Sequence, residues 1–332
     1  MRSKPTQNLA TGQPDGRAQQ LVDALFAVPP GFGVPQLLKI LSTPNVTDLV
    51  ANGAKEWRGN RGSGFEVIHG IDCSEGDLAA LCRELVDLAD RHLDLANPIC
   101  DVALTVRQLP ELQQLGIESL RVHAVLESAV SFQTLLSVRV HRAGFTSLAR
   151  LKELGMFDAK QESQLNEIIS QRQNFLIAGP AGSGKTTLLR AMLAATPDLR
   201  TVVVEDTAEL LPVVGHVVGL QARQANIDGR GEVSLQTLSQ QALRMQPQRI
   251  VVGEVRGEEV AVLLQAMNTG HAGSAATIHA NSASAVYARL RGLAPAVSDE
   301  AFQKLACTAV QRVIFLGNSG VRGVEWIGSL QW

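Results

Sequence analysis

The sequence has little of what several classes of protein need. Aromatic residues make up 4% of its 332 residues, too few for a platform on which nucleic-acid bases stack. The formal net charge is −2, so no overall positive field attracts nucleic acid or acidic lipid. No apolar run approaches the roughly 20 residues that span a bilayer. The N-terminus has Arg2 and Lys4 followed by polar residues, without the apolar core of a signal peptide. We therefore expect a cytoplasmic protein without a membrane span.

Cysteine is also scarce, and its spacing excludes the common cysteine frameworks. No C-x-x-C pair occurs among the four cysteines, which are Cys73, Cys82, Cys100 and Cys307. We interpret them as buried residues that behave as apolar side chains, in a protein from a reducing compartment. A metal site or a disulfide among them is not expected. Hydrophobic residues make up 45% of the chain, enough for sizeable cores, and the length suggests about two domains.

One stretch matches a phosphate-binding pattern. The pattern G-x-x-x-x-G-K-[ST] is met by Gly179-Pro180-Ala181-Gly182-Ser183-Gly184-Lys185-Thr186-Thr187. Gly182 and Gly184 let the backbone approach an anion closely, and the N-terminus of the following helix adds the positive end of its dipole. We expect Lys185 to contact the outer phosphates of ATP and the Thr186 hydroxyl to bind Mg²⁺. The alternative is a Gly/Ser turn without a ligand. A buried strand predicted at 175–178 and a helix at 186–195 favour the nucleotide site.

Hydrophobic periodicity predicts two α/β domains. The expected parts are a tail with a short helix over 1–34, an N-terminal α/β domain over 35–142, a linker over 143–160 and an ATPase domain over 161–332. In the N-terminal domain we expect a helix over 74–95 and strands near 46–50, 64–68, 102–106, 120–125 and 135–140. In the ATPase domain helices alternate with strands at 175–178, 201–205, 249–253, 275–279, 312–316 and 324–329, and a long insertion runs from the second of these strands to residue 231. This alternation implies a mostly parallel sheet with helices on both faces.

Polar residues end three of these strands. In parallel sheets ligands bind beyond the carboxyl ends of the strands, so Glu205, Glu254 and His279 are candidates to surround the phosphate loop. Glu205 could instead be an ordinary acidic helix start. The alternative for Glu254 is a residue without a function, because a Gly-Glu pair at the end of a strand is common. The alternative for His279 is a structural residue, because a lone histidine is more often structural than functional. A zinc site is disfavoured, because the nearest other histidine, His271, is eight residues from His279 and no cysteine is close.

With these motifs in order, the chain resembles the ATPases of the type II/type IV secretion superfamily, especially the Tad/Flp pilus and conjugal-transfer branch. The resemblance is strongest over 174–292. Residues 205–210 are similar to the family's Asp box, residues 253–257 to its Walker B motif, and residues 266–271 through 277–281 to its His box. It implies a RecA-like P-loop domain behind a smaller α/β domain, assembled as a hexameric ring with ATP between domains and subunits.

The resemblance also implies roles for individual residues. Glu205 would activate water and, with Thr186 and Glu254, hold Mg²⁺. His279 would sense the γ-phosphate, and Lys185 completes the catalytic set. Two residues of the N-terminal domain, Arg121 and Arg139, would reach ATP. The alternative for them is surface arginines on a strand.

Two positions depart from the family's pattern just before Walker B. Gln246 and Gln248 stand where arginine and aspartate are common, and a glutamine cannot make the bidentate contact of an arginine. Leu109-Pro110-Glu111-Leu112 stands where a Pro-Asp-Gly turn is frequent. From the two glutamines we hypothesise a slow ATPase that depends on its partners.

The function expected is that of an ATP-hydrolysing motor subunit of a pilus or secretion machine. It would work as a homo-oligomeric ring with inner-membrane platform proteins, at the inner face of the cytoplasmic membrane. A RecA-like nucleic-acid translocase is one alternative, against which the net charge of −2 argues. A nucleotide-binding scaffold whose catalysis has decayed is another, which the two glutamines leave open.

Overall fold

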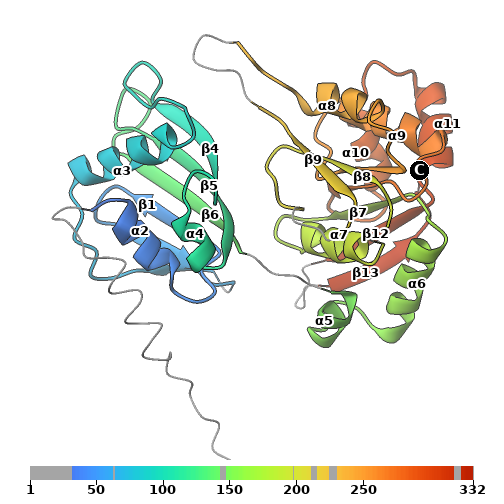
Figure 1. Cartoon of the computed structure of the whole chain (residues 1–332), viewed down its shortest axis with the longest axis horizontal. Helices are drawn as coiled ribbons and strands as arrows, with labels where there is room; N and C mark the ends of the chain where they lie inside the picture. The colour runs from blue at the N-terminus through green and yellow to red at the C-terminus, as the bar shows by residue number, and fades with distance from the viewer. Residues whose placement is uncertain are drawn as a thin grey trace, which may run out of the picture. The chain divides into compact units, whose positions relative to one another are not determined.

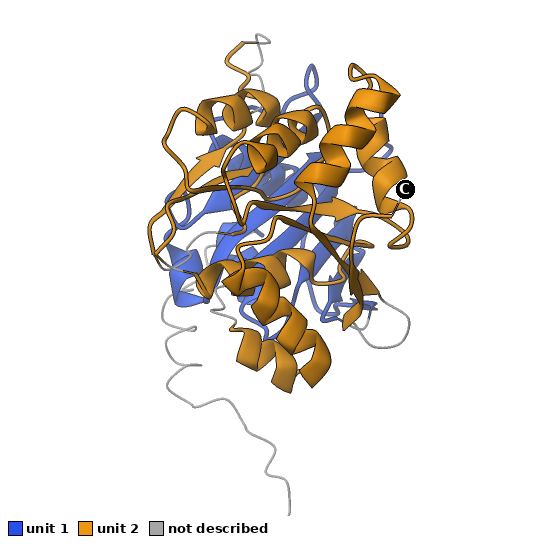
Figure 2. Ribbon diagram, turned by 90° about the vertical axis from the view of Figure 1, so that its right-hand side faces the viewer, with its two compact units in different colours: residues 1–142 blue, residues 143–332 orange. Residues whose placement is uncertain are grey.

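The chain divides into two compact units, Met1–Arg142 and Ala143–Trp332 (Figure 2). The computed structural model describes residues 32–62, 64–142, 147–196, 198–210, 215–223, 230–317 and 323–331. The expected helix at 18–26 and most of the expected tail over 1–34 lie outside the described residues. Among the described residues, no helix has the length and apolar character needed to cross a membrane.

The first unit is built on an antiparallel sheet in the order β3-β2-β1-β6-β5-β4 (Figure 1). Its strands are β1 (Asp48–Asn52), β2 (Trp57–Asn60), β3 (Phe65–Val67), β4 (Ile99–Thr105), β5 (Ile117–Val125) and β6 (Leu135–Arg142). Strand β2 was not predicted, because its sequence Trp-Arg-Gly-Asn contains residues that are depleted in strands. Pairing with β1 on one side and β3 on the other holds it in the sheet.

Among the described residues of this unit, the sheet is accompanied by the helices α2 (Val34–Leu41), α3 (Glu75–Asp87) and α4 (Glu111–Gln114). Helix α3 begins where predicted, because Ser74 Oγ accepts the Asp77 N–H at 3.1 Å and Asp77 Oδ2 accepts the Ser74 N–H at 3.0 Å. Its buried leucines include Leu78 and Leu85. The helix ends at Asp87 rather than at residue 95. Helix α2 was not predicted. Its Pro35 suits a helix start, where the missing N–H leaves no hydrogen bond unmade.

The second unit has a seven-stranded sheet in the order β13-β12-β7-β11-β10-β8-β9. The strands are β7 (Phe175–Gly179), β8 (Thr201–Glu205), β9 (Val217–Gln221), β10 (Arg249–Val252), β11 (Ala275–His279), β12 (Arg312–Gly317) and β13 (Gly323–Gly328). Every pairing is parallel except that of β12 with β13. Strand β9 lies in the stretch expected to be an insertion.

Helices cover both faces of this sheet. They are α5 (Leu148–Glu153), α6 (Ala159–Ser170), α7 (Lys185–Ala194), α8 (Leu235–Ala242), α9 (Glu259–Asn268), α10 (Val286–Leu293) and α11 (Asp299–Ala309). Leu176 of β7 packs in a core with α8 to α11, whereas its neighbour Ile177 packs in a second core with α5, α6 and α7. The expected mostly parallel sheet with helices on both faces is confirmed. Helix α5 lies in the segment expected to be a linker, but Leu151 is buried in the second core, so this helix is part of the second unit.

Candidate active site

The phosphate loop joins β7 to α7, as predicted. Gly184 is the residue that precedes α7 and has φ +96°, and Gly182 has φ +70°. A Cβ on Gly184 would lie 2.7 Å from Met156 Cε, and one on Gly179 would overlap the carbonyl oxygen of Leu316. The backbone angle therefore favours glycine at all three positions, and at Gly179 the backbone of Leu316 also leaves no space for a side chain. A Cβ on Gly182 would meet nothing within 4 Å, which leaves open space beside the loop.

Lys185 and Ser183 place polar groups inside the loop. Lys185 is 7% exposed, and its Nζ donates to the carbonyl oxygens of Gly179 at 3.0 Å and Pro180 at 2.8 Å. Burial lowers the pKa of this lysine, while Glu254 and Glu209 act in the opposite direction. The Ser183 Oγ is buried and has no hydrogen-bond partner among the described residues. A helix N-terminus, a buried ammonium and an unsatisfied hydroxyl fit an anion such as a phosphate group.

The carboxyl ends of β11, β10 and β8 carry a chain of polar contacts. His279 ends β11 opposite Gly179 of the phosphate loop. Its Nε2 lies 3.0 Å from Glu254 Oε1, and Arg256 donates to the other oxygen of Glu254 at 2.5 Å. Arg256 also lies 3.4 Å from Asp206 Oδ2. Burial lowers the pKa of His279, and the charge of Lys185 lowers it further, so the ring is held neutral near pH 7. Glu254 and His279 thus lie together beside the loop.

Glu205 ends β8. In the sheet β11 and β10 lie between β8 and β7, the strand that leads into the phosphate loop. It is 4% exposed, and its Oε1 accepts the backbone N–H groups of Glu209 and Leu210, both at 3.0 Å. Burial raises the pKa of this carboxyl group to about 7. A Cβ on Gly253 would lie 2.8 Å from Glu205 Cγ, so the glutamate packs directly on the backbone of the Walker B motif.

No role was predicted for Arg256, Asp206 or Glu209, although all three lie inside the motifs named above. Arg256 links two acidic side chains from different strand ends. Burial lowers the pKa of Lys185, and the charge of Glu209 opposes part of this shift. In the sequence, the mixture of acidic and basic residues in the Asp box and Walker B motif indicated that charged side chains gather here. The sequence could not show which carboxylate pairs with which cation, because the conformations of the loops after the parallel strands determine these pairs.

Comparison with known proteins identifies the family. The model of the type II/IV secretion system protein family matches residues 112–316. The chain belongs to this family. A putative conjugal transfer protein of Mycobacterium tuberculosis is 42% identical over 264 residues, which are 79% of this chain and 73% of the relative. The type IV secretion system protein VirB11 of Bartonella henselae is 27% identical over 276 residues, 75% of this chain and 76% of the relative.

Two solved structures share the fold of this chain. The pilus retraction motor PilT with bound ADP superposes with a TM-score of 0.62 at 19% identity, covering 88% of this chain and 81% of that one. The Legionella pneumophila ATPase DotB has a TM-score of 0.61 at 18% identity, covering 88% and 78%. These structures share the fold, and the family model and the relatives confirm the resemblance to the secretion superfamily.

In this secretion family member, Arg121 and Arg139 lie side by side on the first unit. They are directly opposed on β5 and β6, and Arg139 Nε lies 2.9 Å from Asp48 Oδ1. Inward-facing neighbours such as Val122 and Val138 are buried in the core of the unit, so the arginines are on the other face of the sheet. That they reach ATP remains a prediction.

The two glutamines of this secretion protein lie away from the candidate site. Both precede β10, at the opposite end of the strand from Glu254, and a four-residue strand spans roughly 13 Å. Gln248 Oε1 accepts the Arg200 N–H at 2.8 Å, and Gln246 has φ +52°. Within one chain, neither glutamine is placed to contact the phosphate loop, because the length of β10 separates them. The parallel strands begin at this side of the sheet, opposite the phosphate loop, and we call it the far edge. His271 also lies there, and its Nδ1 is 3.1 Å from the carbonyl oxygen of Ala266.

At the same far edge, Arg249 holds the C-terminal end of α7. The residue is 4% exposed, and its guanidinium donates to Thr201 Oγ1 at 2.6 Å and Thr196 Oγ1 at 2.5 Å. A weaker bond reaches the Leu193 carbonyl oxygen at 3.3 Å. Burial lowers the pKa of Arg249 to about 10. The helix that begins with Lys185 is thus tied to β8 and β10 at its other end.

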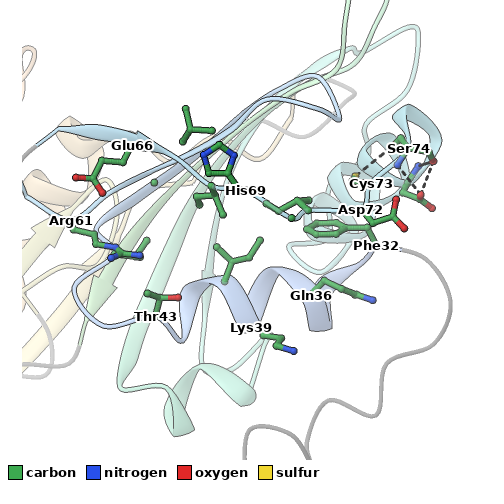
Figure 3. A pocket seen from close by; sticks show the side chains of 18 residues that line it. Phe32, Gln36, Lys39, Thr43, Arg61, Glu66, His69, Asp72, Cys73 and Ser74 are labelled. Carbon is green, nitrogen blue, oxygen red and sulfur yellow. Dashed lines mark hydrogen bonds between the residues drawn. The ribbon is translucent and has the colours of Figure 1, made fainter. Parts of the chain in front are cut away.

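A cavity of about 1090 Å³ lies elsewhere, in the first unit between α2, β3 and the segment that leads into α3 (Figure 3). Its lining combines apolar side chains such as Phe32 and Ile68 with charged ones such as Lys39, Arg61 and Asp72. No residue predicted for the site lines this cavity. It carries none of the chemistry described above.

Proposed function

We propose that the chain is an ATP-hydrolysing motor subunit of a pilus-assembly, conjugal-transfer or secretion machine. One observation carries the proposal: the Glu254–His279 pair lies at the same sheet edge as the phosphate loop, with His279 opposite Gly179. Such an edge is where parallel-sheet proteins bind nucleotides. Membership of the type II/IV secretion family, and a relative named as a conjugal transfer protein, support the cellular role.

The loop residues account for nucleotide binding. Backbone N–H groups of residues 181–184 and the N-terminus of α7 would hold the phosphates, and Lys185 would exchange its two carbonyl contacts for a phosphate oxygen. Thr186 and Glu254 would hold Mg²⁺, directly or through water. The metal, when bound, offsets negative charge on the phosphates.

Three side chains would carry out hydrolysis. Glu254 would hold the metal-bound water, and Glu205 would accept the proton of the attacking water, as the resemblance implies. Burial raises the pKa of Glu205 to about 7, which suits a proton acceptor, and its Oε1 accepts two backbone N–H groups. The lowered pKa of His279 leaves the ring neutral, so that it can donate a hydrogen bond without carrying a charge of its own.

We further propose a hexameric ring of the Tad/Flp type, with ATP bound between domains and subunits. Arg121 and Arg139 would reach the nucleotide from an N-terminal domain, and an arginine supplied in this way can raise the rate by about 10³–10⁵. The ring would act on inner-membrane platform proteins from the inner face of the cytoplasmic membrane. Native mass spectrometry with and without a non-hydrolysable ATP analogue tests the ring. A strict monomer under both conditions would contradict it.

Steady-state ATPase measurements on Lys185→Ala test the proposed activity. We expect turnover to fall by at least about 10²-fold, the usual loss when one preorganised charge-stabilising group is removed. Lys304→Ala, at an exposed position of α11, is the matched control and should keep wild-type turnover. Circular dichroism should show the same fold in all three proteins. Undiminished turnover in Lys185→Ala would refute the assignment, and stimulation by DNA would favour a nucleic-acid translocase.

A further inference from the structure

Helix α3 covers one face of the sheet in the first unit (Figure 1). Its buried side chains, such as Leu78 and Leu85, belong to the core of the unit, whereas Gly76, Ala80 and Glu84 are exposed. Gly76 and Ala80 leave the exposed side of the helix with little side-chain volume, so another chain can approach it closely.

A groove of about 520 Å³ lies between the first half of α3 and the hairpin that joins β5 to β6. Its lining includes Glu75, Ala79 and Arg83 of the helix and Leu126, Glu127 and Phe132 of the hairpin. A second groove of about 540 Å³ continues along the helix from Arg83 to Leu88. Because Arg83 lines both, they form one surface, which we call the α3 groove. The helix has 13 residues, so this surface is about 20 Å long.

The hairpin holds an aromatic side chain in solvent at one end of the α3 groove. Phe132 is fully exposed, and Val130 is exposed as well. Backbone hydrogen bonds fix the hairpin: the Ser128 N–H donates to the Ser131 carbonyl oxygen at 2.9 Å, and the Ser131 N–H donates back at 3.3 Å. An aromatic residue on an ordered loop loses little entropy when a partner covers it, and such residues often dominate the binding energy of an interface. Phe132 therefore has the properties of an interface anchor.

The charge around the α3 groove restricts its partner. Residues 72–101, which contain α3, have eight acidic residues and two arginines, whereas the whole chain has a net charge of −2. The charged residues that line the α3 groove are Glu75, Glu84, Asp87 and Glu127 together with Arg83. Glu75 also accepts the Ala54 N–H at 2.8 Å, a contact that leaves its charge in place. Such a surface repels nucleic acid and acidic lipid, and it attracts a segment that carries Lys and Arg.

We propose that the α3 groove binds a helical segment of a partner protein, with Lys and Arg on one face and apolar side chains on another. The apolar side chains pack on Phe132, Leu126 and Ala79, and the basic ones pair with the acidic residues of the groove. Pairs at the rim of an interface act mainly on specificity and on the rate of association, so the contact with Phe132 contributes most to affinity. Binding at this groove needs neither nucleotide nor turnover, and it goes beyond the proposed function.

Fluorescence anisotropy with the full chain and a labelled helical peptide tests the proposal. The probe has about 14 residues of Lys and Leu, with the leucines on one face. Phe132→Ser should weaken binding at least tenfold, since it removes the anchor without touching the core. Phe65→Ser, at an exposed position of β3 outside the α3 groove, is the matched control and should bind as the wild type does. Replacing Glu84 and Asp87 together by lysine should weaken binding and reduce its dependence on salt.

Several results would overturn the proposal. They are absence of peptide binding to the wild type, unchanged affinity in Phe132→Ser, and equal binding of a peptide in which every Lys is replaced by Glu. Self-association of the wild type that Phe132→Ser abolishes, measured by analytical ultracentrifugation, would show instead that a second copy fills the groove. Binding to vesicles of acidic lipid that the same variant abolishes would assign the groove to a membrane surface. No measurement here contains nucleotide, so these outcomes are independent of whether the chain hydrolyses ATP.

Discussion

Replacing Glu205 by glutamine should change how the stability of the second unit depends on pH. Burial raises the pKa of this carboxyl group from its usual 4.5 to about 7, so the folded protein binds a proton that the unfolded chain releases. Stability from this group is fully present below pH 4.5 and is lost as the pH rises through 7. Each pKa unit is worth about 1.4 kcal/mol, and between pH 5 and pH 8 the wild type should lose about 2–3 kcal/mol that the glutamine variant keeps.

Urea denaturation of both full-length proteins at pH 5 and pH 8 measures this difference. Hydrogen exchange of the β7 and β10 peptides reports unfolding of the second unit separately from the first. Glu300→Gln, at an exposed position of α11, controls for removing a carboxylate elsewhere and should follow the wild type. If wild type and Glu205→Gln lose stability in parallel between pH 5 and pH 8, burial does not hold the Glu205 carboxyl group protonated and the reasoning fails.

Three further predictions concern the sheet around the site. Arg249→Met removes the guanidinium that caps α7 and should destabilise the second unit by about 2–4 kcal/mol in urea denaturation; an unchanged midpoint would contradict this. Gly253→Ala places a new Cβ against Glu205. It should lower the free energy of unfolding by about 1–3 kcal/mol and should lower turnover as well. Wild-type stability and turnover in this variant would show that the side chain of Glu205 moves aside freely. Gln246→Arg lies at the far edge and should leave turnover within about twofold of wild type. A large gain would revive the hypothesis that this glutamine slows hydrolysis.

The parallel core of the second unit was predictable because its strands are continuous apolar runs. Strands β8 and β11 begin and end at the predicted residues, and the phosphate loop lies where its pattern indicated. Strand β9 was missed, since Val217–Gln221 is half exposed at the sheet edge and is a strand by virtue of its pairing with β8. Such edge strands depend on a neighbour that local sequence does not contain.

The site was predictable at the level of strand ends, and not at the level of side-chain contacts. Parallel strands bring their carboxyl ends to one edge, which is why Glu254 and His279 could be expected beside the phosphate loop. The different contacts of the two glutamates could not be read from the sequence. Both lie at the end of an apolar strand, but Glu205 accepts backbone N–H groups of its own loop, whereas Glu254 contacts His279 and Arg256.

The attachment of α7 at both ends has a mechanical consequence. Its N-terminus is the phosphate loop, its C-terminal end is bonded to Arg249, and its ten residues span about 15 Å. A hydrogen-bonded helix is stiff along its axis, so a small shift of the loop on gaining or losing a phosphate would displace the far edge of the sheet by a similar amount. The helix can therefore transmit a displacement along its axis. In this way the presence or loss of a phosphate would change the surface around Arg200 and Gln248, where a neighbouring molecule could respond to it without contacting the nucleotide.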